Sequence, residues 1–139
     1  MNKIFFDANI LIDLINKENK LNKPITILFS ELEKQGKKLY CSPTTFAITY
    51  FFLSKAIKDK KILNTETKAL FSGFIFTRED GVIMEKVKKS AFTDLEDALQ
   101  YYSAMDSDVD MIITKNYFDF SKSAIPVYHP LQYINEFLL

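Results

Sequence analysis

The feature that most constrains this chain is the regular alternation of short apolar segments with amphipathic helical segments. Strands are expected at 3–6, 38–41, 74–77, 111–114 and 125–128, and helices at 9–16, 24–35, 43–58, 64–71, 80–89, 93–105 and 130–138. No tight hairpin signal joins any two of these strands. Strands separated by helices form βαβ units, so we predict a three-layer α/β/α fold with a central, mostly parallel sheet.

Local punctuation supports the helix assignments. Pro24 stands near the start of the second helix and Gly36 follows its end, which is the usual polarity of these two residues. Ser42 followed by Pro43 predicts the start of the long third helix. The segment from Thr93 to Glu96 has the pattern of a capping box, in which the Glu96 side chain reaches back to the Thr93 amide. We therefore expect Glu96 to have a structural role.

Composition indicates one ordinary domain over residues 1–139. The chain is 47% apolar and 26% charged, with 13 Phe, 7 Tyr and one cysteine, so it can bury a core and cannot form an intramolecular disulfide. Asp7 and Asp13 interrupt the apolar N-terminal stretch, which makes it a poor signal sequence or membrane span. We expect a soluble, cytoplasmic protein. The net charge of zero argues mildly against binding nucleic acid by bulk charge alone.

Carboxylates and amides follow the predicted strands at their carboxyl ends, where ligands bind in open α/β sheets. Three separate chain segments contribute candidates: Asp7 and Asn9 after the first strand, Asp94 and Asp97 at the start of helix 93–105, and Thr114, Asn116 and Asp119 after the fourth strand. Oxygen ligands of this kind suit a hard cation such as Mg²⁺ or Mn²⁺. These segments therefore predict a divalent metal site at this edge of the sheet.

Three segments, taken in order, resemble the motifs of PIN domains. They read IFFDANILID at 4–13, DLEDALQYYSA at 94–104 and MIITKNYFDF at 111–120. The resemblance extends from Ile4 to about Pro130, and the similar proteins include VapC-like toxins of type II toxin–antitoxin pairs. It implies a metal-dependent endoribonuclease that cleaves RNA phosphodiester bonds, with Asp7, Asp94, Asp97 and Asp119 as catalytic acids. Of these, Asp7, Asp97 and Asp119 are implied to hold Mg²⁺ or Mn²⁺, with Asp94 assisting them. It also implies a cytoplasmic location, a homodimer and a cognate antitoxin.

The chain departs from the family pattern at one acid. Members of the family usually carry a Glu in the helix after the second strand, and here that segment reads SPTTFAITY at 42–50, with Ile48 at the position of the Glu. No carboxylate occurs between Glu33 and Asp59. Two functions therefore stay open, an active ribonuclease that works with the remaining acids and a weak or inactive PIN-like module that binds RNA or a partner protein.

A third alternative is an unrelated doubly wound phosphotransfer domain. A haloacid-dehalogenase type would need a second Asp where Asn9 stands, and a receiver type would need an acid pair that is not evident at the first strand. Two further residues have structural interpretations. Asp13 is expected on the solvent side of its helix, and His129, which precedes Pro130, is expected to cap the last helix.

Overall fold

A parallel sheet forms the centre of the structure, a computed structural model that describes residues 2–139 apart from the side chain of Tyr117. Its strands in this range are β1 (Lys3–Phe6), β2 (Lys38–Cys41), β3 (Phe74–Phe76), β4 (Met111–Ile113) and β5 (Val127–Tyr128). They lie in the order β3-β2-β1-β4-β5, and each neighbouring pair is parallel. The chain thus builds outward from β1 on one side and then crosses to β4 on the other. A ligand crevice is expected at such a switch point, beyond the carboxyl ends of β1 and β4.

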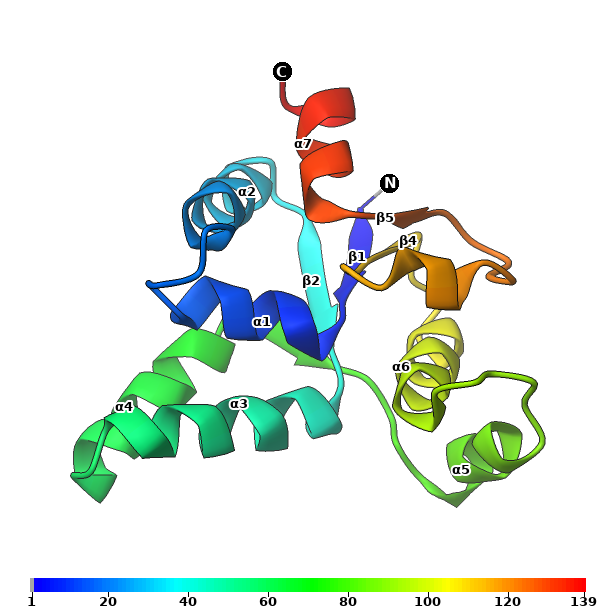
Figure 1. Cartoon of the computed structure of the whole chain (residues 1–139), viewed down its shortest axis with the longest axis horizontal. Helices are drawn as coiled ribbons and strands as arrows, with labels where there is room; N and C mark the ends of the chain where they lie inside the picture. The colour runs from blue at the N-terminus through cyan, green and yellow to red at the C-terminus, as the bar shows by residue number, and fades with distance from the viewer. Residues whose placement is uncertain (1) are drawn as a thin grey trace.

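Seven α-helices surround the sheet in the described part of the chain (Figure 1). They are α1 (Ala8–Ile15), α2 (Asn22–Lys34), α3 (Pro43–Ala56), α4 (Lys60–Phe71), α5 (Gly81–Lys88), α6 (Leu95–Asp106) and α7 (Pro130–Phe137). A short 3-10 helix, η1 (Tyr117–Phe120), follows β4. Helix α1 packs against both α2 and α3, while α5 packs against α6. The three-layer α/β/α architecture predicted from the alternation is confirmed, and the sheet is entirely parallel.

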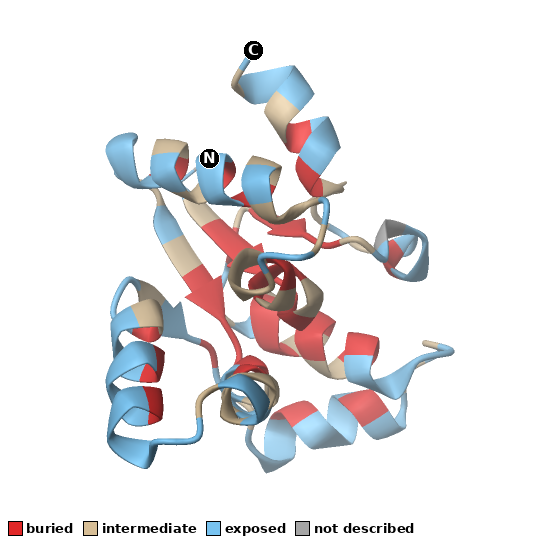
Figure 2. Ribbon diagram, turned by 60° about the vertical axis from the view of Figure 1, so that its left-hand side comes forward, coloured by how far each residue is buried: buried red, intermediate tan, exposed pale blue. Residues whose placement is uncertain are grey.

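Two apolar cores cover the two faces of the sheet, because side chains of a strand alternate between its faces. Ile4 and Phe6 of β1 point toward a core completed by α1, α2 and α7. Phe5 and Ile112 point to the other side, into an aromatic core with Tyr101 of α6. Figure 2 shows the resulting buried band along the central strands. Burial on both faces explains why these strands are continuous apolar runs in the sequence.

Several predicted boundaries shift by a few residues. Helix α4 begins at Lys60 rather than at residue 64, because the Asp59 side chain accepts hydrogen bonds from the amides of Lys61 and Ile62. The last strand is shorter than predicted and covers Val127–Tyr128. His129 caps α7 as expected, since its Nδ1 accepts a hydrogen bond from the Leu131 amide. In the described part of the chain, no helix combines the length and apolarity needed to cross a membrane.

Candidate active site at the carboxyl ends of β1 and β4

Asp7 lies at the junction of β1 and α1 and has only 3% of its surface exposed. Its Oδ1 accepts a hydrogen bond from the Ala8 amide at 2.7 Å, so it caps α1. Its Oδ2 accepts hydrogen bonds from the Thr114 hydroxyl at 2.8 Å and from the Asn9 side-chain amide at 3.3 Å. Burial raises the pKa of Asp7, and the hydrogen bonds from Thr114 and Ala8 oppose that rise. The carboxylate is therefore fixed in one orientation.

The segment after β4 supports Asp7 from the neighbouring strand. Thr114 is fully buried, and its Oγ1 also accepts a hydrogen bond from the Asn116 amide at 3.0 Å. Asn9 extends the link, because its Oδ1 accepts a hydrogen bond from the Lys115 amide at 3.4 Å. The structure thus brings Asn9 and Thr114 to Asp7 as the sequence predicted. Asn116 takes part in this network through its backbone amide, and the residue is exposed to solvent.

Asp97 is the second buried acid of the site. It lies in the first turn of α6 with 4% of its surface exposed, and its Oδ2 has no hydrogen-bond partner among the described residues. Burial raises the pKa of Asp97 to about 7, with further contributions from the negative charges of Asp7, Asp94 and Asp119. The nearby Asp119 side chain also favours the protonated form of Asp97. Acids from three chain segments therefore interact electrostatically at this edge of the sheet.

The start of α6 corrects the predicted capping box. The N-cap is Asp94 and not Thr93, and its Oδ1 accepts hydrogen bonds from the amides of Glu96 and Asp97 at 2.9 and 3.1 Å. Glu96 is exposed and makes no return bond to Thr93 in the contacts described. An Asp side chain caps as well as a Thr, and shifting the start by one residue places Asp97 at the third helical position. Asp94 consequently has a structural role whatever else it does.

Asp119 lies in η1, a helix that the sequence analysis did not predict. Its backbone amide donates a hydrogen bond to the Asn116 carbonyl at 2.8 Å, which closes the turn. The residue is exposed, in contrast to Asp7 and Asp97. The neighbouring Phe120 is 1% exposed and packs against Tyr101, so it anchors η1 to α6. This anchor holds Asp119 beside the start of α6.

The segment 42–50, where the family usually has a Glu, contributes hydroxyls that meet an amide of α6. Ile48 is half-buried on α3. One turn earlier on the same helix, the Thr45 hydroxyl donates a hydrogen bond to the side-chain oxygen of Gln100 in α6. The hydroxyl of Ser42, which caps α3, contacts both the oxygen and the nitrogen of the same side-chain amide. The hydroxyl of Thr49 is buried without a hydrogen-bond partner in residues 2–139. Sequence analysis missed this network because its members are 55 to 58 residues apart along the chain.

One carboxylate does reach the start of α3, from the loop after β3. Oε1 of Glu79 accepts hydrogen bonds from the amide and the hydroxyl of Thr44, at 2.7 and 2.9 Å. Its Oε2 is buried and, among the described residues, lacks a hydrogen-bond partner. A negative charge at a helix N-terminus is favourable. Glu79 therefore stabilises the start of α3. It is not among the acids that raise the pKa of Asp97.

The expectation for Asp13 was wrong. Asp13 is 2% exposed, and its Oδ2 lies 2.6 Å from Nζ of Lys115, whose side chain is 30% exposed. The error arose because this face of α1 meets the segment after β4, where Lys115 contacts both Asp13 and Asn9, one turn earlier on the helix. His129 lies near this pair. Burial lowers the pKa of His129, the positive charge of Lys115 lowers it further, and the negative charge of Asp13 raises it.

The carboxylates of the site meet some of the requirements of a Mg²⁺ ion. In residues 2–139, no three side chains of His, Cys, Asp or Glu lie at distances from which they could jointly hold one metal ion. Mg²⁺, however, commonly binds through one or two carboxylates, several waters and substrate phosphate. Asp7 and Asp97 supply two such carboxylates, and the unpaired Oδ2 of Asp97 is a buried oxygen without a proton donor. The set of Asp7, Asp97 and Asp119 as metal ligands stays a prediction.

The fold is similar to those of several solved toxin–antitoxin structures. VapBC-1 from nontypeable Haemophilus influenzae superposes with a TM-score of 0.67 at 16% identity, covering 92% of this chain and 98% of that one. VapBC2 from Rickettsia felis gives 0.64 at 16% identity, covering 91% and 97%. A toxin–antitoxin complex from Klebsiella pneumoniae gives 0.65 at 24% identity, also covering 91% and 97%. These likenesses establish the fold alone.

Sequence comparison gives the family. No curated protein matches the chain in sequence. The model of the PIN domain matches residues 3–117, which include Asp7, Asp94 and Asp97 and end two residues before Asp119. This match covers most of the chain and agrees with the strand order. The chain therefore belongs to the PIN domain family.

Proposed function

We propose that this protein is a Mg²⁺- or Mn²⁺-dependent endoribonuclease and the toxin of a toxin–antitoxin pair. The observation that carries the proposal is the pair of buried acids, Asp7 and Asp97, at the switch point of the sheet. Burying carboxylates without a cation is costly, and the Oδ2 of Asp97 has no donor in residues 2–139. A site that retains such groups is a candidate for function rather than for stability.

The roles of the residues follow from their contacts. Asp7 and Asp97 would hold the ion, with Asp119 acting directly or through a water. Thr114 and Asn9 fix the orientation of Asp7, and Asp94 fixes the start of α6 and hence the position of Asp97. When bound, the metal would lower the pKa of a coordinated water and neutralise charge that develops on the phosphate.

A matched pair of variants in α6 tests the activity. Asp97→Asn removes a buried carboxylate of the site and keeps its shape, whereas Glu96→Gln changes the exposed neighbour. With Mn²⁺ and end-labelled single-stranded RNA, we expect Asp97→Asn to lose about 100-fold or more of the cleavage rate and Glu96→Gln to keep most of it. Equal rates in wild type and a folded Asp97→Asn variant would contradict the assignment.

Metal binding is tested separately from activity by thermal shift. A ligand that binds only the folded state raises the melting temperature by mass action. We expect Mn²⁺ to raise it in wild type and to do so much less in Asp7→Asn. Identical shifts in the two proteins would exclude Asp7 as a ligand without bearing on whether RNA is cleaved.

A second candidate is a weak or inactive module that binds RNA or a partner protein. Ile48 favours it, because no carboxylate of α3 completes the usual family set. Wild-type protein that takes up Mn²⁺ but leaves RNA intact would support this alternative.

The partners proposed are RNA, a cognate antitoxin and a second copy of this chain, in the cytoplasm. Solved relatives of the same fold are described as VapBC and toxin–antitoxin complexes, which supports an antitoxin partner. Co-expression with the product of a small neighbouring reading frame, followed by size-exclusion chromatography with light scattering, measures both associations. A monomer that never co-purifies with that product would count against them.

A further inference from the structure

A hollow of about 400 Å³ lies between α6 and η1 and shares Asp119 with the acidic site. It is lined by two chain segments and by α6 itself: Ala91, Phe92 and Thr93, then Phe118, Asp119, Ser121 and Lys122, with Tyr101 and Tyr102. Both segments continue directly into the acidic site, since Thr93 precedes the capping Asp94 and Asp119 belongs to both places. The hollow is therefore an extension of the candidate active site.

Aromatic rings form much of its wall. Phe92 and Tyr102 are half-buried, with their ring centroids 6.1 Å apart, and Tyr101 is 9% exposed. Tyr101 is held from behind, because its hydroxyl accepts a hydrogen bond from the Ala124 amide at 3.1 Å. Phe92 also packs on Tyr101 and Phe120, at centroid distances of 5.4 and 6.0 Å. These rings are fixed by packing before any ligand arrives.

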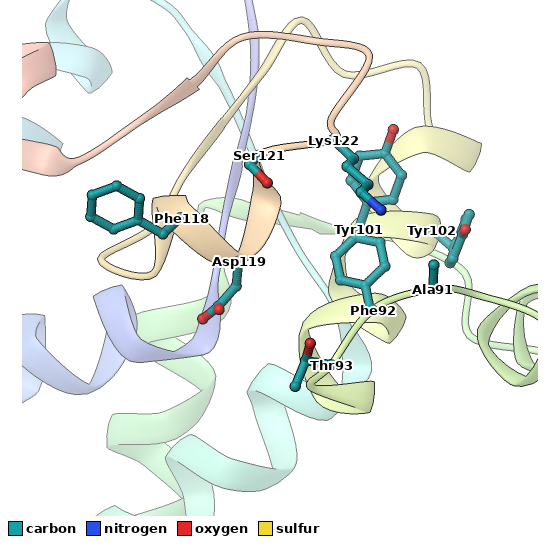
Figure 3. Close-up of a pocket in the computed structure, with 9 residues that line it drawn as sticks. All are labelled: Ala91, Phe92, Thr93, Tyr101, Tyr102, Phe118, Asp119, Ser121 and Lys122. Atoms are coloured by element: carbon teal, nitrogen blue, oxygen red, sulfur yellow. The ribbon is translucent and has the colours of Figure 1, made fainter.

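Polar groups stand around this aromatic wall. Lys122 contributes an ammonium group to the lining, and Thr93 and Ser121 contribute hydroxyls (Figure 3). In the same view, the carboxylate of Asp119 points away from the rings. The hollow thus presents flat apolar surfaces, one cation and hydroxyls, while the negative charge of Asp119 is turned from them.

We propose that this hollow holds a nucleobase of single-stranded RNA next to the phosphate that the acidic site acts on. Unpaired bases stack on aromatic side chains in proteins that bind single-stranded nucleic acid, and the backbone is followed by cations. The volume lies within the range of small-molecule pockets. The proposal rests on the ribonuclease function above and adds how its substrate is positioned: a base in the hollow fixes the adjacent phosphate over Asp7 and Asp97.

The test uses binding, so that it does not depend on cleavage. Short fluorescent oligoribonucleotides carrying one abasic nucleotide, moved stepwise along the sequence, are titrated with wild-type protein in Ca²⁺ or in EDTA. We expect affinity to fall about fivefold or more when the abasic position coincides with the base in the hollow, since one base stacked on an aromatic ring contributes about 5- to 150-fold.

Variants connect the abasic penalty to the hollow. Tyr102→Leu should weaken binding of the intact RNA by a similar factor and abolish the penalty, because both changes remove the same stacking contact. Tyr102→Phe keeps the ring and should retain the penalty. Phe51→Leu, at an exposed aromatic residue of α3 that does not line the hollow, is the matched control and should change nothing. Circular dichroism and melting confirm folding of each variant, and Phe92→Leu replaces Tyr102→Leu if the latter unfolds.

The outcomes separate the two proposals. Suppose that the protein cleaves RNA and that the abasic penalty is unchanged in folded Tyr102→Leu and Phe92→Leu. This result would overturn the base-binding role and leave the ribonuclease function standing. A penalty that these variants abolish, without any cleavage in Mn²⁺, would support the base site and overturn the enzymatic function. Uniform affinity along the abasic series would overturn the base site.

Discussion

The hydroxyl of Thr114, at the end of β4, donates a hydrogen bond of 2.8 Å to Oδ2 of Asp7, at the end of β1. The two residues are 107 positions apart in sequence, and both are buried. The bond exists because β1 and β4 are parallel neighbours whose carboxyl ends meet at one edge of the sheet. It ties the segment 111–120 to the segment 4–13, the last and the first of the three that resemble PIN motifs.

This hydrogen bond should stabilise the folded protein. Thr114→Val preserves shape but removes the donor, so we expect a loss of about 1–3 kcal/mol in the free energy of unfolding at neutral pH. Thr114→Ser keeps the hydroxyl and should lose less. Urea denaturation of the three proteins measures the difference. If the Val and Ser variants were equally stable, the hydroxyl would not be supporting Asp7.

Stability of the metal-free protein should fall as the pH rises toward neutrality. The pKa of Asp97 is 3.8 in its ordinary environment and about 7 in the fold, so the folded state holds a proton that the unfolded state has lost. The stabilising contribution is full below about pH 3.8 and is lost as the pH rises through about 7. Asp7, whose pKa is also raised, acts in the same direction.

Urea denaturation in EDTA between about pH 5 and about pH 8 measures this slope. In Asp97→Asn the slope should be clearly smaller, and the variant should be the more stable protein at the upper end. Glu96→Gln is the control and should keep the wild-type slope. A wild-type protein that gains stability over this range would show that Asp97 is not the group that takes up the proton.

Ile48→Glu should increase RNA cleavage, because it supplies a carboxylate at the position where the family usually has a Glu. Ile48 is one turn beyond Thr45, which contacts Gln100, and Asp97 is one turn before Gln100 on α6. We therefore expect the new carboxylate to reach the acidic site and to raise Mn²⁺-dependent RNA cleavage about tenfold or more.

The control for this variant is Ile48→Gln, which has a similar size and no charge. Both changes place a polar group at a half-buried position and should cost about 1–3 kcal/mol of stability. Melting curves and circular dichroism establish that each variant folds. A folded Glu variant no faster than the Gln variant would indicate a site that has reorganised around other groups.

The ion pair between Asp13 and Lys115 should stabilise the folded protein. Because Asp13 is 2% exposed, Lys115→Met would leave a buried charge without its partner, at a cost of about 1–3 kcal/mol for a lysine that is itself 30% exposed. Lys34→Met, in the exposed pair with Glu31, should change stability by less than about 0.5 kcal/mol. Thermal denaturation compares the two.

The chain has one histidine, so a proton NMR titration reports on His129 alone. Lys115 lowers the pKa of His129 and Asp13 raises it. Lys115→Met should therefore move that pKa upward, and Asp13→Asn should move it downward. Shifts of the same sign in both variants would argue that the three side chains are not close in solution.

The sequence by itself determined the architecture of this protein. Apolar strands that alternate with helices, without hairpin turns, leave a parallel three-layer arrangement as the efficient way to bury both faces of each strand. It also placed Asp7, Asn9, Thr114 and Asp119 at one edge of the sheet, because residues that follow neighbouring parallel strands meet there. Asp97 follows no strand, and its place beside Asp7 came from the packing of α6. The absence of an acid at Ile48 was visible from the resemblance to the PIN family pattern.

Only the tertiary structure decided which polar groups are buried and paired. Asp13 was expected in solvent and is covered by packing, and its partner Lys115 is 102 residues away. Local pattern placed the cap of α6 at Thr93, one residue too early, because the choice between two competent capping side chains is made by how the helix docks. The hollow beside Asp119 combines η1 with α6, and no local signal specifies such a contact between distant segments. Burial and long-range pairing depend on how helices pack on the sheet, and that information is distributed over the whole chain.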